Sequence, residues 1–60
     1  MNPWIYEIIE NLDEASEADV LRALDELEYL YDALDDIDRD VSDKLIERLN
    51  RRLAELRRRA

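Results

Sequence analysis

A broad row of apolar residues at helical spacing runs through the centre of this chain. Its main members recur at intervals of four, three, four and three residues: Val20, Leu24, Leu27, Tyr31 and Leu34. Three more residues widen the row into a stripe: Leu21, Ala23 and Leu30. The intervals match the period of an α-helix, and no alternating strand pattern competes with them. We therefore predict a helix over residues 17–35, with Leu27 at the centre of the core.

The start of this helix carries a capping signal. Ser16 stands just before it and Asp19 follows three residues later, which is the spacing of a capping box with Asp in place of the usual Glu. Residues 13–16 are then a short polar connection that leads into the helix.

A shorter apolar row predicts a first helix of about ten residues. Its members follow the i, i+3, i+4, i+7 pattern: Ile5, Ile8, Ile9 and Leu12. Asn2 is a good N-cap, and Pro3 suits the first helical position because its missing N–H would have had no partner there. Trp4 is expected in the core or at its edge.

A third apolar row predicts a C-terminal helix. Its members again have helical spacing: Leu45, Ile46, Leu49, Leu53 and Leu56. The row is followed by Arg57, Arg58 and Arg59, where cations suit the negative end of the helix macrodipole.

Residues 35–43, between the second and third rows, allow two interpretations. No Gly or Pro interrupts them, and Ile37 and Val41 nearly continue both rows, so one long helix over residues 17–59 is an alternative. We favour a turn, because five of these nine residues are Asp. Asp is a poor residue inside a helix and a strong N-cap.

Capping of the third helix would explain most of the acidic run. Four residues could serve as its cap: Asp36, Asp38, Asp40 and Ser42. A cap at Ser42 would also let Val41 pack on Ile46 as a hydrophobic staple.

Charge is divided unevenly along the chain. Residues 1–43 carry fifteen acids and two bases, a net charge of −13, and residues 44–60 carry seven bases and two acids, a net charge of +5, which together give −8. An antiparallel hairpin would bring the three terminal arginines beside Glu14, Glu17 and Asp19. Each exposed pair is worth only ~0–1 kcal/mol, but together the pairs favour this topology. We therefore predict an all-α fold: a short N-terminal helix plus an antiparallel helical hairpin, a three-helix bundle forming a single domain over residues 1–60.

The short first helix is expected to leave part of the hairpin uncovered. It spans roughly 15 Å and the second helix roughly 27 Å, so it covers only the half near Glu17. The other half would expose several apolar residues: Leu30, Tyr31, Leu34, Ile37, Leu45 and Ile46. An uncovered apolar groove usually marks an interface. We predict a homodimer whose interface contains Leu30, Tyr31, Leu34, Ile37 and Ile46.

The acidic run also has the spacing of a calcium site. Four residues occupy positions 1, 3, 5 and 12 of an EF-hand-like window: Asp36, Asp38, Asp40 and Glu47. Ser42 at position 7 could add its carbonyl. However, position 6 needs Gly for a sharp turn and holds Val41, while position 8 is usually apolar and holds Asp43. We therefore expect helix capping here, and no bound metal.

The arginines of the third helix raise the alternative of nucleic-acid binding. Five of them could form a basic face for phosphates: Arg48, Arg51, Arg52, Arg58 and Arg59. The strongly acidic chain as a whole repels phosphates at long range. In addition, Glu47 and Glu55 are spaced to pair with Arg51 and Arg59 on the helix surface. A solvated, ion-paired face is therefore the favoured interpretation, and we do not expect nucleic acid as a partner.

The composition excludes several kinds of chemistry. The chain contains no Cys, no His and no Gly. Disulfides and thiolate metal sites are therefore excluded, and the commonest general base is absent. Phosphate-binding loops and nucleophile elbows need Gly and are excluded as well. We predict no enzymatic activity, no catalytic residues and no cofactor.

These observations favour a structural role. We expect a non-enzymatic helical bundle that acts as a self-association or protein-interaction module. The lack of Gly, Cys and His, with acids at helix starts and Arg at helix ends, also matches design heuristics, so a de novo designed bundle without an evolved function is included in this prediction. The alternative is a small acidic regulatory protein that binds a basic protein surface.

The sequence also bears on location. No apolar run approaches the ~20 residues of a membrane span. No charged segment followed by an apolar stretch opens the chain, so we expect no signal peptide. The resulting expectation is a soluble, cytoplasmic protein with no membrane partner.

Overall fold

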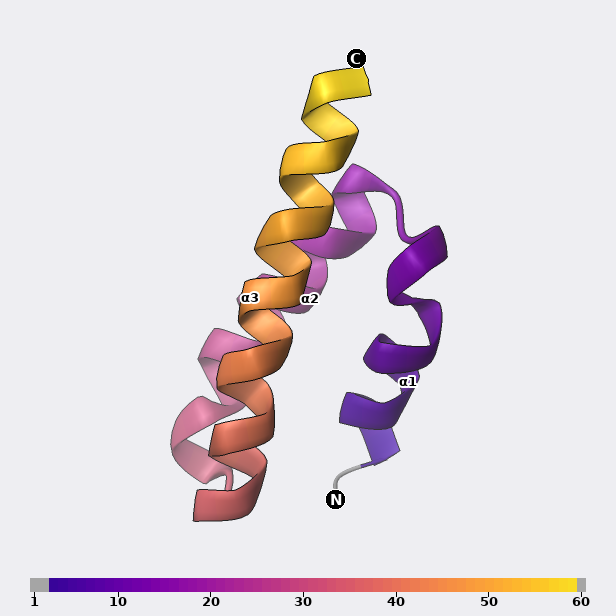
Figure 1. The fold of residues 1–60 in the computed structure, drawn as a ribbon. Coiled ribbons are helices and arrows are strands. Elements are labelled where there is room, and N and C mark those ends of the chain that lie inside the picture. Colours follow the sequence, from indigo (N-terminus) through magenta and orange to yellow (C-terminus); the bar gives the residue numbers. More distant parts are fainter. Residues whose placement is uncertain (1–2, 60) are drawn as a thin grey trace.

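The computed structural model describes residues 3–59, which form three α-helices and two short 3₁₀-helices (Figure 1). In chain order the elements are α1 (Pro3–Asn11), η1 (Leu12–Glu14), α2 (Glu17–Leu30), η2 (Tyr31–Ala33) and α3 (Asp36–Arg59). Within this part of the chain the only residues outside a helix are Ala15, Ser16, Leu34 and Asp35. The predicted all-α fold is confirmed. The expected N-cap, Asn2, lies outside the described residues.

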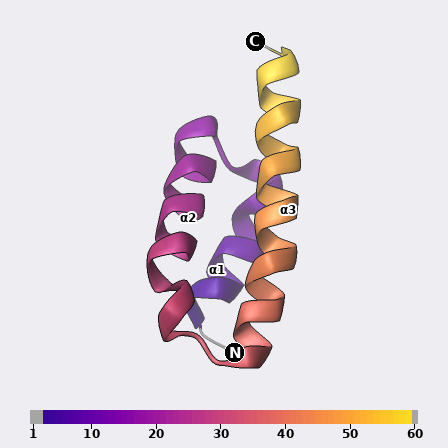
Figure 2. The ribbon, with the colours of Figure 1, turned by 90° about the vertical axis from the view of Figure 1, so that its left-hand side faces the viewer.

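The three α-helices are arranged around a hairpin. Helices α2 and α3 run antiparallel side by side, and α1 lies against one face of this pair (Figures 1 and 2). Backbone contact is most extensive between α2 and α3. The last turns of α3 project beyond the first turn of α2 (Figure 2), and the molecule measures 37 × 17 × 15 Å. The predicted helical hairpin is therefore present.

The start of α2 forms as its sequence predicts. The Ser16 Oγ accepts a hydrogen bond from the Asp19 N–H at 3.2 Å. The backbone of Ser16 is extended, with φ −75° and ψ 168°, as an N-cap requires. This bond satisfies one of the amide donors that the first turn of a helix leaves without a partner.

The predicted turn between the second and third helices is confirmed, but the cap predicted for it is wrong. The Asp35 Oδ1 accepts the Asp38 N–H at 2.8 Å, so Asp35 caps a third helix that begins at Asp36. The second helix is correspondingly shorter than predicted, because α2 ends at Leu30 and η2 follows it. The rest of the acidic run, residues 36–43, lies within α3.

Starting α3 this early changes the role of Ser42. It lies inside the helix and is fully buried, so it cannot cap the helix start. Val41 and Ile46 both lie within α3 as well, and the predicted staple across a helix start does not apply. The predicted caps Asp38 and Asp40 are interior residues of α3, and Asp36 is its first residue.

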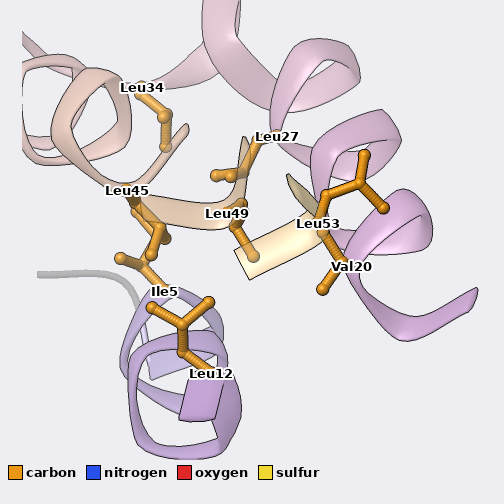
Figure 3. Packing of buried hydrophobic residues seen from close by; sticks show 8 residues of the cluster. All are labelled: Ile5, Leu12, Val20, Leu27, Leu34, Leu45, Leu49 and Leu53. Atoms are coloured by element: carbon orange, nitrogen blue, oxygen red, sulfur yellow. The ribbon is translucent and has the colours of Figure 1, made fainter. Parts of the chain in front are cut away.

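All three α-helices contribute to one hydrophobic core. Its buried members are Ile5, Leu12, Val20, Leu27, Leu34, Leu45, Leu49 and Leu53 (Figure 3). Leu27 is among the fully buried side chains, as its central place in the apolar stripe predicts. Ile5 of α1 and Leu12 of η1 point toward the α3 leucines, so the N-terminal segment packs on the hairpin (Figure 3). No helix within residues 3–59 is long and apolar enough to cross a membrane.

Candidate interaction groove between α1 and α2

Arginine side chains of α3 donate hydrogen bonds to backbone carbonyls in both connections, the one between α1 and α2 and the one between α2 and α3. Helices often end at a glycine, which adopts the left-handed conformation without steric cost. Among residues 3–59 no backbone φ is positive. The C-terminal carbonyls must therefore find other donors, and arginine side chains can provide them.

The corner between α1 and α2 is closed by Arg52. Its Nε and Nη2 both donate to the Ala15 carbonyl oxygen, each at 3.2 Å. The Ala15 N–H in turn donates to the Leu12 carbonyl at 3.2 Å. The corner between α1 and α2 is thus joined to α3 by hydrogen bonds.

The junction between α2 and α3 is closed by Arg39. Its Nε donates to the Tyr31 carbonyl at 3.2 Å and its Nη2 to the Asp32 carbonyl at 3.0 Å. The guanidinium also lies 5.6 Å from the centre of the Tyr31 ring, within the range of a cation–π contact. The Tyr31 hydroxyl donates to the Asp43 carboxylate at 3.3 Å.

This environment affects the ionisation of Tyr31. Partial removal of water raises the pKa of the phenol above its ordinary value of 10.0, and the Asp43 carboxylate raises that pKa further. Arg39 acts in the opposite direction. The net shift is upward, because the neutral phenol is easier to desolvate and can donate to Asp43.

A groove of about 460 Å³ separates α1 from α2. Six of the twelve residues that line it are apolar: Trp4, Ile8, Leu12, Ala15, Ala23 and Leu49. Helix α1 supplies Trp4 and Ile8 from one face, and Ala23 on α2 keeps the opposite wall low because its side chain is small. Leu49 of α3 lies at the base, where the two other helices diverge.

Carboxylates surround this groove. Four acidic residues contribute to its lining: Glu7, Glu14, Asp19 and Glu26. Arg22 is the lining residue of opposite charge, and its Nη1 lies 4.0 Å from the Asp19 Oδ1. The lining thus combines apolar side chains with a net negative charge, and we name this feature the α1–α2 groove.

The predicted dimer interface does not form one continuous surface. Tyr31 and Ile46 line a second groove, of about 440 Å³, together with Leu24, Glu28 and Asp32. Leu30 lines a different hollow, beside Tyr29 and Asp25. The structure therefore brings together two of the five predicted residues.

The remaining predicted interface residues have opposite environments. Leu34 is only 8% exposed and belongs to the core, whereas Ile37 is 76% exposed on the first turn of α3. Leu45, expected to be uncovered, is also buried. The expectation was wrong for Leu34 and Leu45 because Ile5 at the start of α1 reaches the junction end of the hairpin and packs toward Leu45 (Figure 3).

The residues with calcium-loop spacing lie on a continuous helix. Asp36, Asp38, Asp40 and Glu47 all belong to α3. A helix separates positions that the calcium loop folds around one ion. Within residues 3–59, no three His, Cys, Asp or Glu side chains form a group that could hold a metal ion.

The arginines of the candidate basic face on α3 partly form contacts within the protein. Arg52 is half-buried against the Ala15 carbonyl, and the Arg57 Nε pairs with the Glu17 Oε1 at 3.1 Å, as the hairpin topology predicts. Arg48, Arg51, Arg58 and Arg59 are exposed. Among residues 3–59, the predicted helix-surface pairs of Arg51 with Glu47 and of Arg59 with Glu55 do not reach ion-pair distance, while Lys44 pairs with Asp40 at 3.5 Å.

Sequence reasoning missed the α1–α2 groove. The apolar row of α1 and the small Ala23 were visible, but the contact of Arg52 with the corner between α1 and α2 joins residues that are 37 apart in the sequence. No local pattern reports such a contact. Comparison of this chain with protein-family models, with curated proteins and with solved structures found no match.

Proposed function

We propose that this chain is a non-enzymatic protein-interaction module whose α1–α2 groove binds a basic amphipathic helix of another protein. The observation that carries the proposal is that six apolar side chains and four carboxylates line the same groove. A helix placed in this groove would lie against all three α-helices and complete a four-helix arrangement.

The floor accounts for the apolar side of such a partner. Ile8, Leu12 and Leu49 line the groove while also belonging to the core or packing against it. A partner helix with apolar residues at i, i+3, i+4 and i+7 presents one apolar stripe, which is how helices bind grooves of this kind. Burying one such side chain contributes ~1.5–3 kcal/mol before the cost of association.

The rim accounts for the charge of the partner. Glu7 and Glu14 lie on the α1 side, and Asp19 and Glu26 lie on α2. The whole chain has a net charge of −8, so the long-range field also attracts cations. Lysines and arginines beside the apolar stripe of the partner would meet carboxylates on both walls. Electrostatic complementarity of this kind chiefly sets orientation and association rate.

Trp4 provides an intrinsic signal for the test. It is the only tryptophan of the chain and it lines the α1–α2 groove. A synthetic helical peptide without tryptophan, with leucines at i, i+3, i+4 and i+7 and flanking arginines, would be titrated into the protein. We expect the Trp4 emission to shift to shorter wavelength and to saturate, because the peptide removes water from the indole.

Charge-reversal variants locate the binding site. Glu7→Lys changes a residue of the groove, and Glu10→Lys makes the same charge change on the same helix outside the groove lining. We expect Glu7→Lys to weaken binding about 3- to 10-fold and Glu10→Lys to weaken it less than about 2-fold, since a rim charge pair is worth ~0–1 kcal/mol and reversal also adds repulsion. Raising the salt concentration should reduce this difference.

Two outcomes would contradict the proposal. Equal weakening by both variants would mean that the peptide responds to net charge alone and does not occupy the groove. Saturable binding without any change in Trp4 emission would place the peptide on another surface.

A further inference from the structure

Two residues interrupt what would otherwise be one continuous helix from Glu17 to Arg59. These are Leu34 and Asp35, between η2 and α3. Tyr31 has helical dihedral angles, φ −53° and ψ −45°. Leu34 has φ −82°, within the helical range, and only its ψ of 150° is extended. Straightening the junction therefore requires a change in ψ at Leu34 and the loss of the capping conformation at the adjacent Asp35.

The sequence at this junction contains no residue that forces a turn. The chain has no Gly, and its single Pro is Pro3. Proline is the residue that blocks a continuing helix most strongly, and glycine commonly ends one. The apolar stripe of α2 also continues through the junction, because four of its positions are seven residues apart: Val20, Leu27, Leu34 and Val41.

We propose that two copies of this chain exchange α3 by straightening the junction, which gives a domain-swapped dimer. The antiparallel contacts between α2 and α3 then form between copies instead of within one. Short connections that are stable in two conformations are a known route to such exchange. This self-association uses the hairpin junction and does not depend on the α1–α2 groove.

Exchange would also cover an exposed residue. Ile37 is 76% exposed in the first turn of α3. In the exchanged dimer the two straightened junctions cross at the two-fold axis, so Leu34 and Ile37 of one copy lie next to the same residues of the other. An apolar side chain that water surrounds in the single chain gains an apolar neighbour in the dimer.

Two side chains hold the junction closed in the single chain. Asp35 accepts the Asp38 N–H at 2.8 Å, and Arg39 donates to the carbonyls of Tyr31 and Asp32. In a continuous helix the Asp38 N–H and the carbonyls of Tyr31 and Asp32 have backbone hydrogen-bond partners. The side-chain bonds from Asp35 and Arg39 are then no longer needed to satisfy these groups. The balance between the two forms thus depends on Arg39, on Asp35 and on protein concentration.

Opposing variants test this dependence. Arg39→Gln removes the donors that favour the closed junction, and Arg48→Gln makes the same charge change at an exposed position of α3. Asp36→Pro places proline at the first position of α3, where it is favoured beside the Asp35 cap but incompatible with a continuous helix.

The first measurement is mass by light scattering after refolding from denaturant at low and at high protein concentration. For the unmodified chain we expect the 7.2 kDa species at low concentration and a species of twice that mass at high concentration. Arg39→Gln should raise the dimer fraction several-fold relative to Arg48→Gln at equal concentration. Asp36→Pro should remain monomeric, and its far-UV circular dichroism will show whether it is folded.

A second measurement distinguishes exchange from ordinary association. Glu17 of α2 and Arg57 of α3 are in contact, and the chain has no cysteine of its own. Chains carrying only Glu17→Cys and chains carrying only Arg57→Cys would be mixed, refolded together and treated with a short bis-maleimide. Exchange places the two substituted positions of different chains together, so we expect a crosslinked heterodimer that is several-fold more abundant than in a mixture made after separate refolding.

Three results would overturn the proposal. The first is a 7.2 kDa mass at every concentration for both the unmodified chain and Arg39→Gln. The second is a dimer that forms equally well in folded Asp36→Pro. The third is an equal yield of crosslinked heterodimer from chains refolded together and from chains mixed after separate refolding. This result can be obtained even if Asp36→Pro does not fold.

Discussion

Two serines show how the position of one hydroxyl decides its effect on stability. Ser16 caps α2 and accepts the Asp19 N–H, whereas the Ser42 Oγ is buried inside α3 without a hydrogen-bond partner. A buried polar atom that lacks a partner costs about 1–3 kcal/mol of desolvation free energy. The same substitution should therefore have opposite signs at the two sites.

Ser42→Ala is expected to raise the free energy of unfolding by about 1 kcal/mol or more, because it removes the unpartnered hydroxyl and improves helix propensity. Ser16→Ala should lower it by about 1 kcal/mol, since the α2 cap is lost. Urea unfolding followed by circular dichroism measures both. A loss of stability in Ser42→Ala would mean that this hydroxyl makes a favourable contact after all.

Arg52 is expected to contribute through its hydrogen bonds more than through its charge. Arg52→Gln should lower the free energy of unfolding by about 1.5–3 kcal/mol, because the Ala15 carbonyl loses a charged donor at a half-buried corner. Arg51→Gln, at an exposed position of the same helix, is the matched control and should change it by less than about 0.5 kcal/mol. Equal effects in thermal unfolding would show that only net charge matters.

At the scale of whole elements, α2 supplies the centre of the core. Leu27→Ala should lower the free energy of unfolding by about 2–5 kcal/mol, because a fully buried leucine is replaced by a cavity. Leu21, on the same helix, is 45% exposed, and Leu21→Ala should cost less than about 1 kcal/mol. For a domain of this size each kcal/mol lowers Tm by about 4–8 °C, so differential scanning calorimetry separates the two variants. Similar Tm values would mean that the buried face of α2 is elsewhere.

The positions of the three helices could largely be predicted from the sequence, because they depend on residues close together in the chain. Apolar spacing placed the three helices, and Ser16 with Asp19 marked the start of α2. The end of α2 was not readable, since Arg39 closes it by reaching back from α3. Several aspartates competed for the cap of α3. The choice of Asp35 depends on Leu34 entering the core, which is a tertiary event.

The candidate site was less readable than the helices. The acidic charge of the first two helices suggested a basic protein surface as the alternative to self-association, and this partner remains a proposal. The groove proposed to receive it lies between α1 and α2, beside a corner that Arg52 contacts from 37 residues away. The expected dimer patch failed as a continuous surface because α1 reaches farther along the hairpin than its length alone suggested, and Leu34 and Leu45 became buried.

At the scale of the whole molecule, Tyr31 connects stability to pH. Its pKa is raised in the folded state above the ordinary value of 10.0, so the unfolded chain loses the phenolic proton at lower pH than the folded chain does. The contribution of Tyr31 is thus fully present below about pH 10 and is lost as the pH rises through the higher folded pKa.

The unmodified protein is expected to lose stability above about pH 10, and Tyr31→Phe should make this decline smaller. Tyr29→Phe is the control, because Tyr29 is 86% exposed and should leave the decline in place. Urea midpoints measured between pH 8 and about pH 11 compare the variants. If both variants retained the full decline, other groups would account for it.

The two arginine contacts also imply an order of events while the chain is being made. Arg39 closes the α2–α3 junction from seven or eight residues away, so this contact can form as soon as the first turns of α3 leave the ribosome. Arg52 closes the α1–α2 corner from 37 residues away, so this contact forms only after most of α3 has been made. Closing so long a loop is slow relative to local contacts. We expect α1 to take its final position only after Arg52 has been synthesised, and the α1–α2 groove to form later than the α2–α3 junction.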